Sequence, residues 1–408
     1  MAPLLGMDGL GILAVRPHSQ ADRVSQSRRR VRAVGVRLFH LPAQHPADHR
    51  GGVHIATVIR ILVVVAAIVT AILPVEPHVV ERWFSRSWYP PLQRVLGAVA
   101  NRVAWSMFDV TIVAVVVGAV VMVVVRVRGA RGLARKRRWW NAAFDVVALA
   151  GAVYLVFMTT WGWHYRRMPL ATRLDVRAEG LTSARVRELA DTATYHLNSL
   201  HAAANKTPWP AAHEWATRLA PAFDAAQRAL GVQPPALPAV PKATALGPWF
   251  VRAGIAGMTN PFQFDVMLTP DALPFELPAL LAHEWGHVAG FAREDEAGFV
   301  GFVTTQQGDA QARYSGWLDV YVRLLSALPR AERQAIHARL AAGPRADLEA
   351  VERRLERVSP AAQHVAWTGY DSYLKSNRVR EGLDSYDGVV TLMARARFDE
   401  HWRPAVTR

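Results

Sequence analysis

Three long apolar runs between residues 53 and 163 constrain the fold of this chain more than any other feature. They extend from about Val53 to Leu73, from about Val103 to Val125 and from Trp139 to Trp163. About 20 apolar residues in an α-helix cross the hydrocarbon core of a bilayer, so each run is long enough to do so. The third run begins and ends with tryptophans, which favour the two membrane interfaces. The sequence therefore predicts three transmembrane helices.

The loop between the second and third runs is strongly basic. Residues 126–138 contain seven Arg and Lys residues and no acid. Loops of this composition stay on the cytoplasmic side of a membrane. With three spans, this places the N-terminus in the cytoplasm and everything after Trp163 outside it. We therefore expect a multi-pass protein of the cytoplasmic membrane.

The net charge of +15 has a second possible origin, a nucleic-acid surface. No RNA-binding or helix-turn-helix signature accompanies the charge, and the densest basic cluster lies between two apolar runs. We therefore expect a lipid bilayer as partner, and no nucleic acid. Asp109 and Asp145 lie near the starts of spans, where we expect them to reach the interface or to hydrogen-bond between helices rather than to carry protons.

The chain is predicted to have three parts. Residues 1–52 are polar, Arg-rich and without periodicity, and we expect a disordered basic cytoplasmic tail with no cleavable signal peptide. Residues 53–163 form the transmembrane region. Residues 164–408 have the composition of a soluble, extracytoplasmic domain. The chain contains no cysteine, so any metal ion must be held by histidine and carboxylate side chains.

The pattern of the third part is mainly helical, with a small β element. Ser183 is placed to cap a first helix, and a second helix begins near Pro210 and ends at Gly231. Residues 249–268 contain glycine and proline between β-branched and aromatic residues, and we expect a short strand or an irregular hairpin there. Amphipathic helices are predicted to follow at about 275–289, 292–308, 311–327, 330–342, 345–357, 359–377 and 384–398.

The motif His283-Glu284-Trp285-Gly286-His287 carries the most chemical information. On a helix, residues four apart lie on one face, so His283 and His287 can bind one metal ion. Glu284 lies beside that face and can take a proton from a zinc-activated water, which makes it the expected catalytic general base. A second His-Glu pair, His213-Glu214, has threonine where the second histidine is needed, and we interpret it as a surface pair.

A third ligand is expected shortly after the motif. On a continuous helix Glu294 would lie roughly 10 Å beyond His287, so the hypothesis requires a helix break at Gly290. A following helix would then have an almost bare face, Ala297, Gly298 and Gly301, which can pack closely near Gly286. We favour Glu294 as the third zinc ligand. Glu296 remains an alternative, and Asp295 or Glu296 can instead orient the imidazole rings.

The stretch HEWGHVAGFAREDEAGF, from His283 to Phe299, resembles the signature of a bacterial membrane family catalogued as domain of unknown function 3810. The resemblance extends over roughly residues 53–400. Further matching segments are Trp161-Gly162 with Tyr165 and Pro169-Leu170, Gly257-Met258 with Pro261-Phe262, Tyr373-Leu374-Lys375, and Ser385-Tyr386 with Val389-Val390 and Leu392.

The resemblance implies a zincin-like metallopeptidase domain behind three membrane spans, with His283, Glu284 and His287 in the usual roles. The pattern Glu294-x-x-Ala297 also resembles the ligand helix of glutamate-zincins. The chain departs from the family at Gly298, where asparagine is usual, so any support by that asparagine is missing. It also has Trp285-Gly286 where a small aliphatic pair is usual. Gly286 costs helix stability, which indicates that it permits close packing.

Two readings of function follow. The first is a membrane-anchored peptidase with one zinc ion (Zn2+) that hydrolyses peptide or protein substrates outside the bacterial cytoplasmic membrane. The second is a catalytically silent sensor or scaffold that keeps a zincin fold. A peptidase also needs a donor for the developing oxyanion, and Tyr386, Tyr373 and His364 are the candidates. The site lies about 120 residues beyond the last span, so cleavage within the bilayer is not expected.

Overall fold

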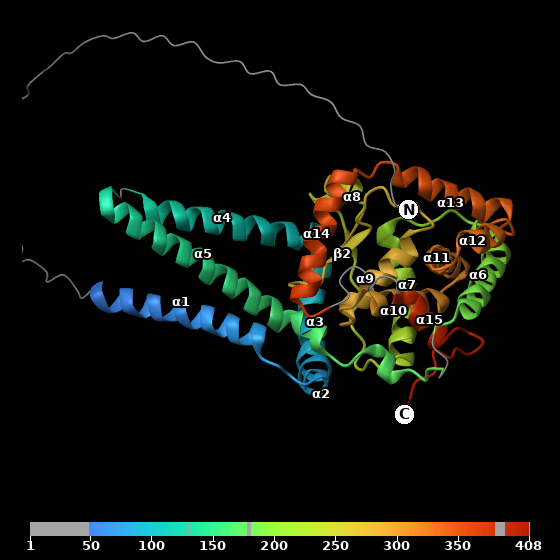
Figure 1. Ribbon diagram of the computed structural model, residues 1–408, viewed down its shortest axis with the longest axis horizontal. Coiled ribbons are helices and arrows are strands. Elements are labelled where there is room, and N and C mark those ends of the chain that lie inside the picture. The colour runs from blue at the N-terminus through green and yellow to red at the C-terminus, as the bar shows by residue number, and fades with distance from the viewer. Residues whose placement is uncertain (1–48, 129–130, 178–180, 380–387, 408) are drawn as a thin grey trace, which may run out of the picture. The chain divides into compact units, whose positions relative to one another are not determined.

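The computed structural model describes the chain in four stretches, residues 49–128, 131–177, 181–379 and 388–407. The described residues are mainly helical, with one small sheet (Figure 1). Residues Val53–Arg408 form one unit by their mutual contacts. The predicted boundaries at residues 52 and 163 are based on composition, and they stay predictions.

Three helices are long and apolar enough to cross a membrane: α1 (His49–Ile72), α4 (Met107–Val127) and α5 (Gly132–Thr160). α4 begins later than expected because the side chain of Ser106 accepts a hydrogen bond from the backbone N–H of Asp109 and caps the helix there. α5 begins at Gly132, before the expected start at Trp139. The residues between these two positions are mostly Arg and Lys, which are good helix formers.

Two acids, of which Asp145 is buried, join these helices to each other and to the domain. Asp145 of α5 forms ion pairs with Arg60 of α1 (3.0 Å) and with Arg126 of α4 (2.6 Å). Asp109 of α4 accepts hydrogen bonds from the Thr244 hydroxyl and the Ala245 N–H, both at 2.7 Å. Both acids therefore form contacts between elements, as expected for charged groups near a membrane.

The segment between α1 and α4 is helical and packs on the domain. It consists of α2 (Pro77–Val79), a π-helix η1 (Val80–Trp88) and α3 (Tyr89–Asn101). The hydroxyl of Tyr89 donates to the carbonyl of Val288 (2.6 Å), and Gln93 donates to the carbonyl of Leu237 (2.9 Å). This segment and the domain therefore lie on the same side of the three apolar helices. Which side of the membrane that is stays a prediction.

The domain begins with two 3-10 turns, η2 (Gly162–Arg166) and η3 (Leu170–Arg173), and continues as helices. The N-cap of the first helix is Thr182, one residue before the expected cap Ser183. The side chain of Thr182 accepts a hydrogen bond from the N–H of Arg185. The helices are α6 (Ser183–Ala204), α7 (Ala212–Ala229), α8 (Gly247–Ala253), α9 (Leu277–Val288), α10 (Glu294–Gln306), α11 (Ala310–Ser326), α12 (Arg330–His337), α13 (Ala342–Leu355), α14 (Pro360–Ser376) and α15 (Gly388–Arg395).

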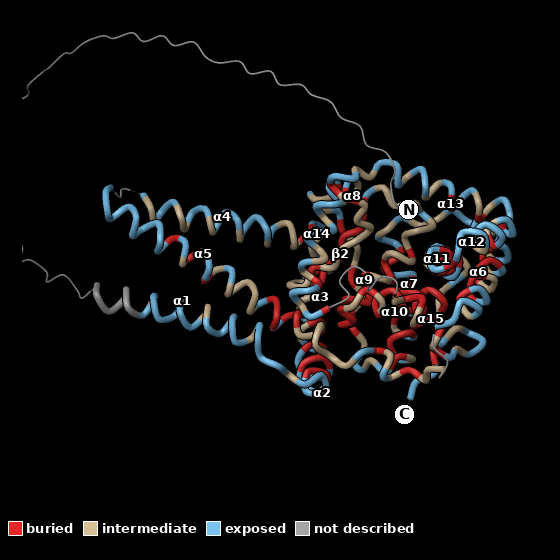
Figure 2. The backbone as a smooth tube through the Cα atoms, in the orientation of Figure 1, coloured by how far each residue is buried: buried red, intermediate tan, exposed pale blue. Residues whose placement is uncertain are grey.

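The core of the domain forms around α9 and α10, which are among its most buried elements (Figure 2). Trp215 of α7, Trp285 of α9 and Trp317 of α11 are buried in it. α10 buries nearly all of its residues, so it lies between α9 and the outer helices rather than at the surface. The candidate metal residues are therefore held within the closely packed core of the domain.

The sheet has three short strands in the order β1-β3-β2. β1 (Pro241–Lys242) pairs in parallel with β3 (Val266–Leu268), and β2 (Gly257–Thr259) pairs antiparallel with β3. Of the two alternatives expected here, a short strand or an irregular hairpin, the structure has the hairpin, and β2 is an edge strand. The first residues of the predicted segment instead form α8, which begins with Pro at its first turn and ends at Gly254 with φ 70°.

Candidate metal centre

The two histidines of the motif and one glutamate converge on a common point. His283 and His287 lie one turn apart on α9, and Glu294 is the first residue of α10. Nε2 of His283 is 3.1 Å from Oε2 of Glu294, and Nε2 of His287 is 3.6 Å from Oε1. The three donor atoms all lie within 4.8 Å of one another. Two imidazoles and a carboxylate at this spacing suit a tetrahedral zinc ion with one open position.

The chain returns to the histidines through the turn at Gly290. Gly290 has φ 84°, and the N–H of Phe291 donates to the carbonyl of Gly286 (3.1 Å), which closes the end of α9. A Cβ atom at Gly290 would lie 2.5 Å from the ring of His164. Both the backbone conformation and the close contact therefore require glycine, and the predicted helix break is confirmed.

α9 and α10 cross at glycine positions on both helices. A Cβ at Gly286 would lie 2.9 Å from Cα of Ala297, and a Cβ at Gly301 would lie 3.0 Å from the backbone N of His283. The bare face that the sequence indicated on α10 is therefore the face that packs against the motif helix. This close crossing brings the first turn of α10 to the imidazoles.

The neighbouring acids point elsewhere. Oε1 of Glu296 accepts from the N–H of Leu170 (2.6 Å), and Asp295 pairs with Arg293 (3.1 Å). Burial raises the pKa of Glu296 to about 7, opposed by the Leu170 hydrogen bond. The geometry thus brings Glu294, and not Glu296, to the histidines. That Glu294 binds a metal stays a prediction.

The supporting contacts of the two imidazoles differ. Nδ1 of His287 donates to the carbonyl of Phe291 (2.8 Å), which leaves Nε2 as the ring atom that could bind a metal ion. Among the described residues, nothing hydrogen-bonds to the buried Nδ1 of His283. A Cβ at Gly298 would lie 3.8 Å from that atom. The absence of a side chain at Gly298, noted from the sequence, therefore coincides with a missing partner of His283.

The three groups form a buried ionic cluster. Burial alone would raise the pKa of Glu294, but His287 and His283 hold it well below its ordinary value. Burial alone would lower the pKa of His287, but the Glu294 carboxylate beside it raises that pKa to about 9. The carboxylate is therefore charged at neutral pH, and His287 carries a proton that a metal ion must displace.

Glu284 lies beside the three groups, under the edge strand. Its Oε2 accepts from the Thr259 hydroxyl at 2.7 Å, and a Cβ at Gly257 would lie 2.6 Å from its Oε1. Only glycine therefore lets β2 pass so close to this carboxylate. Burial raises the pKa of Glu284 above its ordinary value, although His283 and His287 oppose this. A raised pKa improves a carboxylate as a proton acceptor near neutral pH.

One cavity of ≈ 1400 Å³ is lined by His283, Glu284, His287 and Glu294 together. β2 and α14 also line it, and so do α4 and α5, two of the helices that are long and apolar enough to cross a membrane. Trp161, directly after α5, donates its indole N–H to the carbonyl of His287 at 3.1 Å. The chain therefore folds back and packs the motif helix against the end of α5, although about 120 residues separate the two along the sequence. That cleavage takes place outside the bilayer stays a prediction.

The predicted oxyanion donors fall in different places. Tyr386 lies outside the described residues, and His364 is exposed. Tyr373 lines the cavity, and burial raises its pKa further above the ordinary value. The sequence reasoning missed Tyr370, which also lines the cavity and donates its hydroxyl to Oε1 of Glu294. The three-residue spacing of Tyr370 and Tyr373 on one helix face was the available signal.

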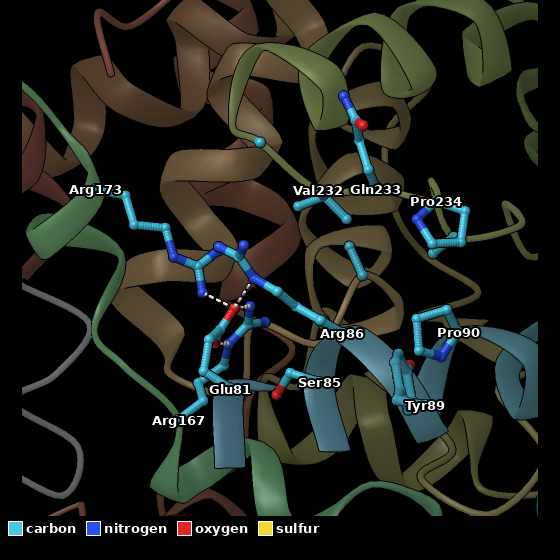
Figure 3. Close-up of a pocket in the computed structure, with 13 residues that line it drawn as sticks. Glu81, Ser85, Arg86, Tyr89, Pro90, Arg167, Arg173, Val232, Gln233 and Pro234 are labelled. Carbon is cyan, nitrogen blue, oxygen red and sulfur yellow. Dashed lines mark hydrogen bonds and ion pairs between the residues drawn. The ribbon is translucent and has the colours of Figure 1, made fainter. Parts of the chain in front are cut away.

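A second buried cluster supports the turn after α9. Glu81 of η1 binds Arg167, Arg173 and Arg86, which converge on its carboxylate (Figure 3). Arg167 also donates to the carbonyl of Gly290 at 2.7 Å. The cluster therefore ties the segment between α1 and α4 to the turn that positions Glu294.

The comparisons with known proteins identify a family. The model of a family described as Protein of unknown function (DUF3810) matches residues 84–394, more than half of the 408 residues. The matched region includes α4, α5, the motif helix and Glu294. No curated protein and no solved structure gives a match. The chain therefore belongs to the DUF3810 family.

Proposed function

We propose that this protein is a membrane-anchored, zinc-dependent peptidase of the glutamate-zincin kind, which hydrolyses peptide bonds outside the cytoplasmic membrane. The observation that carries the proposal is the convergence of His283, His287 and Glu294 within 4.8 Å, with Glu284 in the same cavity. A purely structural histidine pair would not need a buried carboxylate of raised pKa beside it.

Zinc bound by the three residues would lower the pKa of a water molecule to about 7 and polarise the substrate carbonyl. Glu284 takes the proton of the attacking water on its carboxylate and delivers it to the leaving nitrogen. The Thr259 hydroxyl, bonded to Oε2 at 2.7 Å, fixes the orientation of this carboxylate. Hydrolysis consumes one water and leaves a carboxyl group and an amine.

β2 is suited to hold an extended peptide. Ala256 accepts from Thr269, and Asn260 donates to Asp265, so these two residues turn their backbone groups toward the β3 side. In an antiparallel pair the direction alternates, so the backbone N–H and C=O of Gly257 and Thr259 face the open edge. A substrate strand that pairs there lies beside Gly257 and Thr259, the two residues of β2 that lie against Glu284.

The test uses purified full-length protein. We expect about one zinc per chain, and hydrolysis of a peptide library that is lost on adding a chelator. Glu284→Gln should retain the metal and abolish hydrolysis, because it removes only the proton acceptor. Glu214→Gln is the matched control, since Glu214 follows a histidine in an exposed helix turn and should change neither property.

Two outcomes contradict the proposal. Wild-type protein that binds zinc and cleaves nothing would favour the catalytically silent scaffold. Hydrolysis that survives in Glu284→Gln would exclude Glu284 as the base.

A further inference from the structure

The cavity that contains the candidate metal centre continues between α4 and α5. Beyond the four site residues its wall there is apolar except for Tyr154 of α5, and it is formed mainly by Phe108, Val115 and Ala119 of α4 and by Val146, Ala150 and Phe157 of α5. We call this part of the cavity the α4/α5 groove. Because both helices are long and apolar enough to span a membrane, the groove lies at membrane depth.

The groove extends across about half of the bilayer. Phe157 and Val146 are 11 residues apart on one helix, which corresponds to about 16 Å, against about 30 Å for the hydrocarbon core. The next residue, Asp145, is ion-paired with Arg126 of α4, so the groove ends at a polar contact. A transmembrane helix needs the full thickness of the core and does not fit such a groove. One acyl chain of the same leaflet does.

The groove is open to the bilayer. Ala150 is exposed and Val146 has an exposed fraction of 39%, and in a spanning helix both face lipid. Another face of α5 is covered by α1, since a Cβ at Gly151 would lie 3.4 Å from Ala67. An apolar chain can therefore enter the groove laterally from the lipid phase.

The polar end of the groove is the metal centre. Trp161, directly after the last residue of α5, donates to the carbonyl of His287, which places the site at the level where the span ends. Beyond the site the cavity is lined by Asp319 and Arg323 of α11. The occupant therefore needs an apolar tail, a hydrolysable bond at the interface and a polar continuation outside the membrane.

We propose that the substrate is a lipid-anchored polypeptide, with its acyl chain in the α4/α5 groove and its scissile peptide bond at His283, Glu284 and His287. This inference rests on the proposed function and names its substrate class. The anchored peptide continues from the groove along β2. An acylated peptide needs a large site, and the cavity of ≈ 1400 Å³ exceeds the roughly 300–1,000 Å³ of ordinary small-ligand pockets.

The test compares binding of two fluorescent peptide libraries of the same composition, N-palmitoylated and N-acetylated, to full-length Glu284→Gln protein in lipid nanodiscs. Any acylated peptide concentrates at a bilayer, so a comparison of the two libraries alone does not test the groove. Variants of groove residues test it. Ala150→Trp fills the groove and should weaken binding of the palmitoylated peptides by about tenfold. Val147→Trp, on the lipid-facing side of α5 and outside the groove, should leave that binding unchanged.

A second measurement needs no groove variant. A photoreactive group at the end of the palmitoyl chain should cross-link to α4 and α5 near Val115 and Val146. Equal binding to Ala150→Trp and Val147→Trp, or cross-links elsewhere, would overturn the proposal. Stronger competition by helix-anchored peptides or by phospholipid than by palmitoylated peptide would do so as well.

The two proposals fail in different ways. If palmitoylated peptides bind in the groove and the wild-type protein with zinc does not hydrolyse them, the peptidase is wrong and the lipid-anchor site stands. If acetylated and palmitoylated peptides in nanodiscs are hydrolysed at equal rates and Ala150→Trp changes neither, the peptidase stands and the groove has no such role.

Discussion

His287 and Glu294 form a buried pair whose proton must leave before a cation binds. The pKa of His287 is raised to about 9 because the Glu294 carboxylate outweighs the effect of burial. Below that pH the bound proton competes with zinc, so the zinc affinity should rise by about tenfold per pH unit as pH increases. Competition titrations of the full-length protein between about pH 6.5 and about pH 8.5 measure this slope.

The control for that slope is His213→Ala, which removes an exposed histidine and should leave it unchanged. A zinc affinity that is constant over this pH range would mean that His287 is already neutral, and that the ion pair with Glu294 does not form in solution.

Among the described residues, Tyr370 is the tyrosine best placed to stabilise negative charge beside the candidate metal centre. Its hydroxyl donates to Oε1 of Glu294, and during turnover it can donate to a developing oxyanion instead. Tyr370→Phe should lower kcat by about 10²-fold with little change in KM and no loss of zinc. Tyr195→Phe is the control, because Tyr195 is exposed. Loss of zinc with unchanged kcat per bound zinc would assign Tyr370 to holding Glu294 in place.

At the scale of elements, the crossing of α9 and α10 determines the geometry of the candidate metal centre. A Cβ at Gly286 would meet backbone atoms of Ala297 at 2.9 Å, which cannot move as a flexible side chain can. Gly286→Ala should therefore push α10 away from α9 and destabilise the protein by about 1–3 kcal/mol. It should also weaken zinc binding, because Glu294 moves with α10. Thermal unfolding and zinc titration measure the two effects.

Gly369→Ala in α14 is the matched control, since a Cβ there meets nothing within 4 Å. It should stabilise the helix by about 0.5–1 kcal/mol and leave zinc binding unchanged. Wild-type zinc affinity in Gly286→Ala would show that the close crossing does not position Glu294.

The local parts of the site could be predicted from the sequence because they depend on short spacings. His283 and His287 are four positions apart, and Gly290 interrupts the helix before Glu294, so helix geometry alone brings these groups close. The hairpin of β2 and β3 was likewise visible in its glycines and β-branched residues. Tyr370 was missed because its approach to Glu294 depends on how α14 packs, 76 residues further along the chain.

At the scale of the whole molecule, the sequence did not predict that the domain packs on the membrane helices. Tyr89 and Val288 are 199 residues apart and are joined by a hydrogen bond, and Asp265 accepts from the N–H of Met107 at the start of α4. Neither contact has a local signature, because both depend on tertiary packing. Spacings along the chain therefore could not predict that the site lies beside the end of α5, or that the cavity continues into the α4/α5 groove.

The Glu81 cluster joins the segment between α1 and α4 to the domain. Of the contacts between these two parts, it is the one whose loss should lower the stability of the protein most. The side chains of Glu81 and Arg167 are 7% and 6% exposed, so Glu81→Gln leaves buried arginines without their carboxylate and should destabilise the protein by about 3–5 kcal/mol. Glu188→Gln, at an exposed ion pair, is the control and should change stability by less than about 0.5 kcal/mol. Chemical unfolding in detergent micelles measures both.

The same cluster predicts a pH dependence. Burial would raise the pKa of Glu81, but Arg167, Arg173 and Arg86 hold it below its ordinary value of 4.5. The unfolded chain therefore binds the proton first as pH falls, so the stability from Glu81 is present above about pH 4.5 and is lost as pH falls through the folded pKa. Wild-type protein should lose this contribution on acidification, and Glu81→Gln should not. If both proteins lose stability equally below that pH, the arginines do not depend on the charge of Glu81, and the turn at Gly290 is held by Arg167 without it.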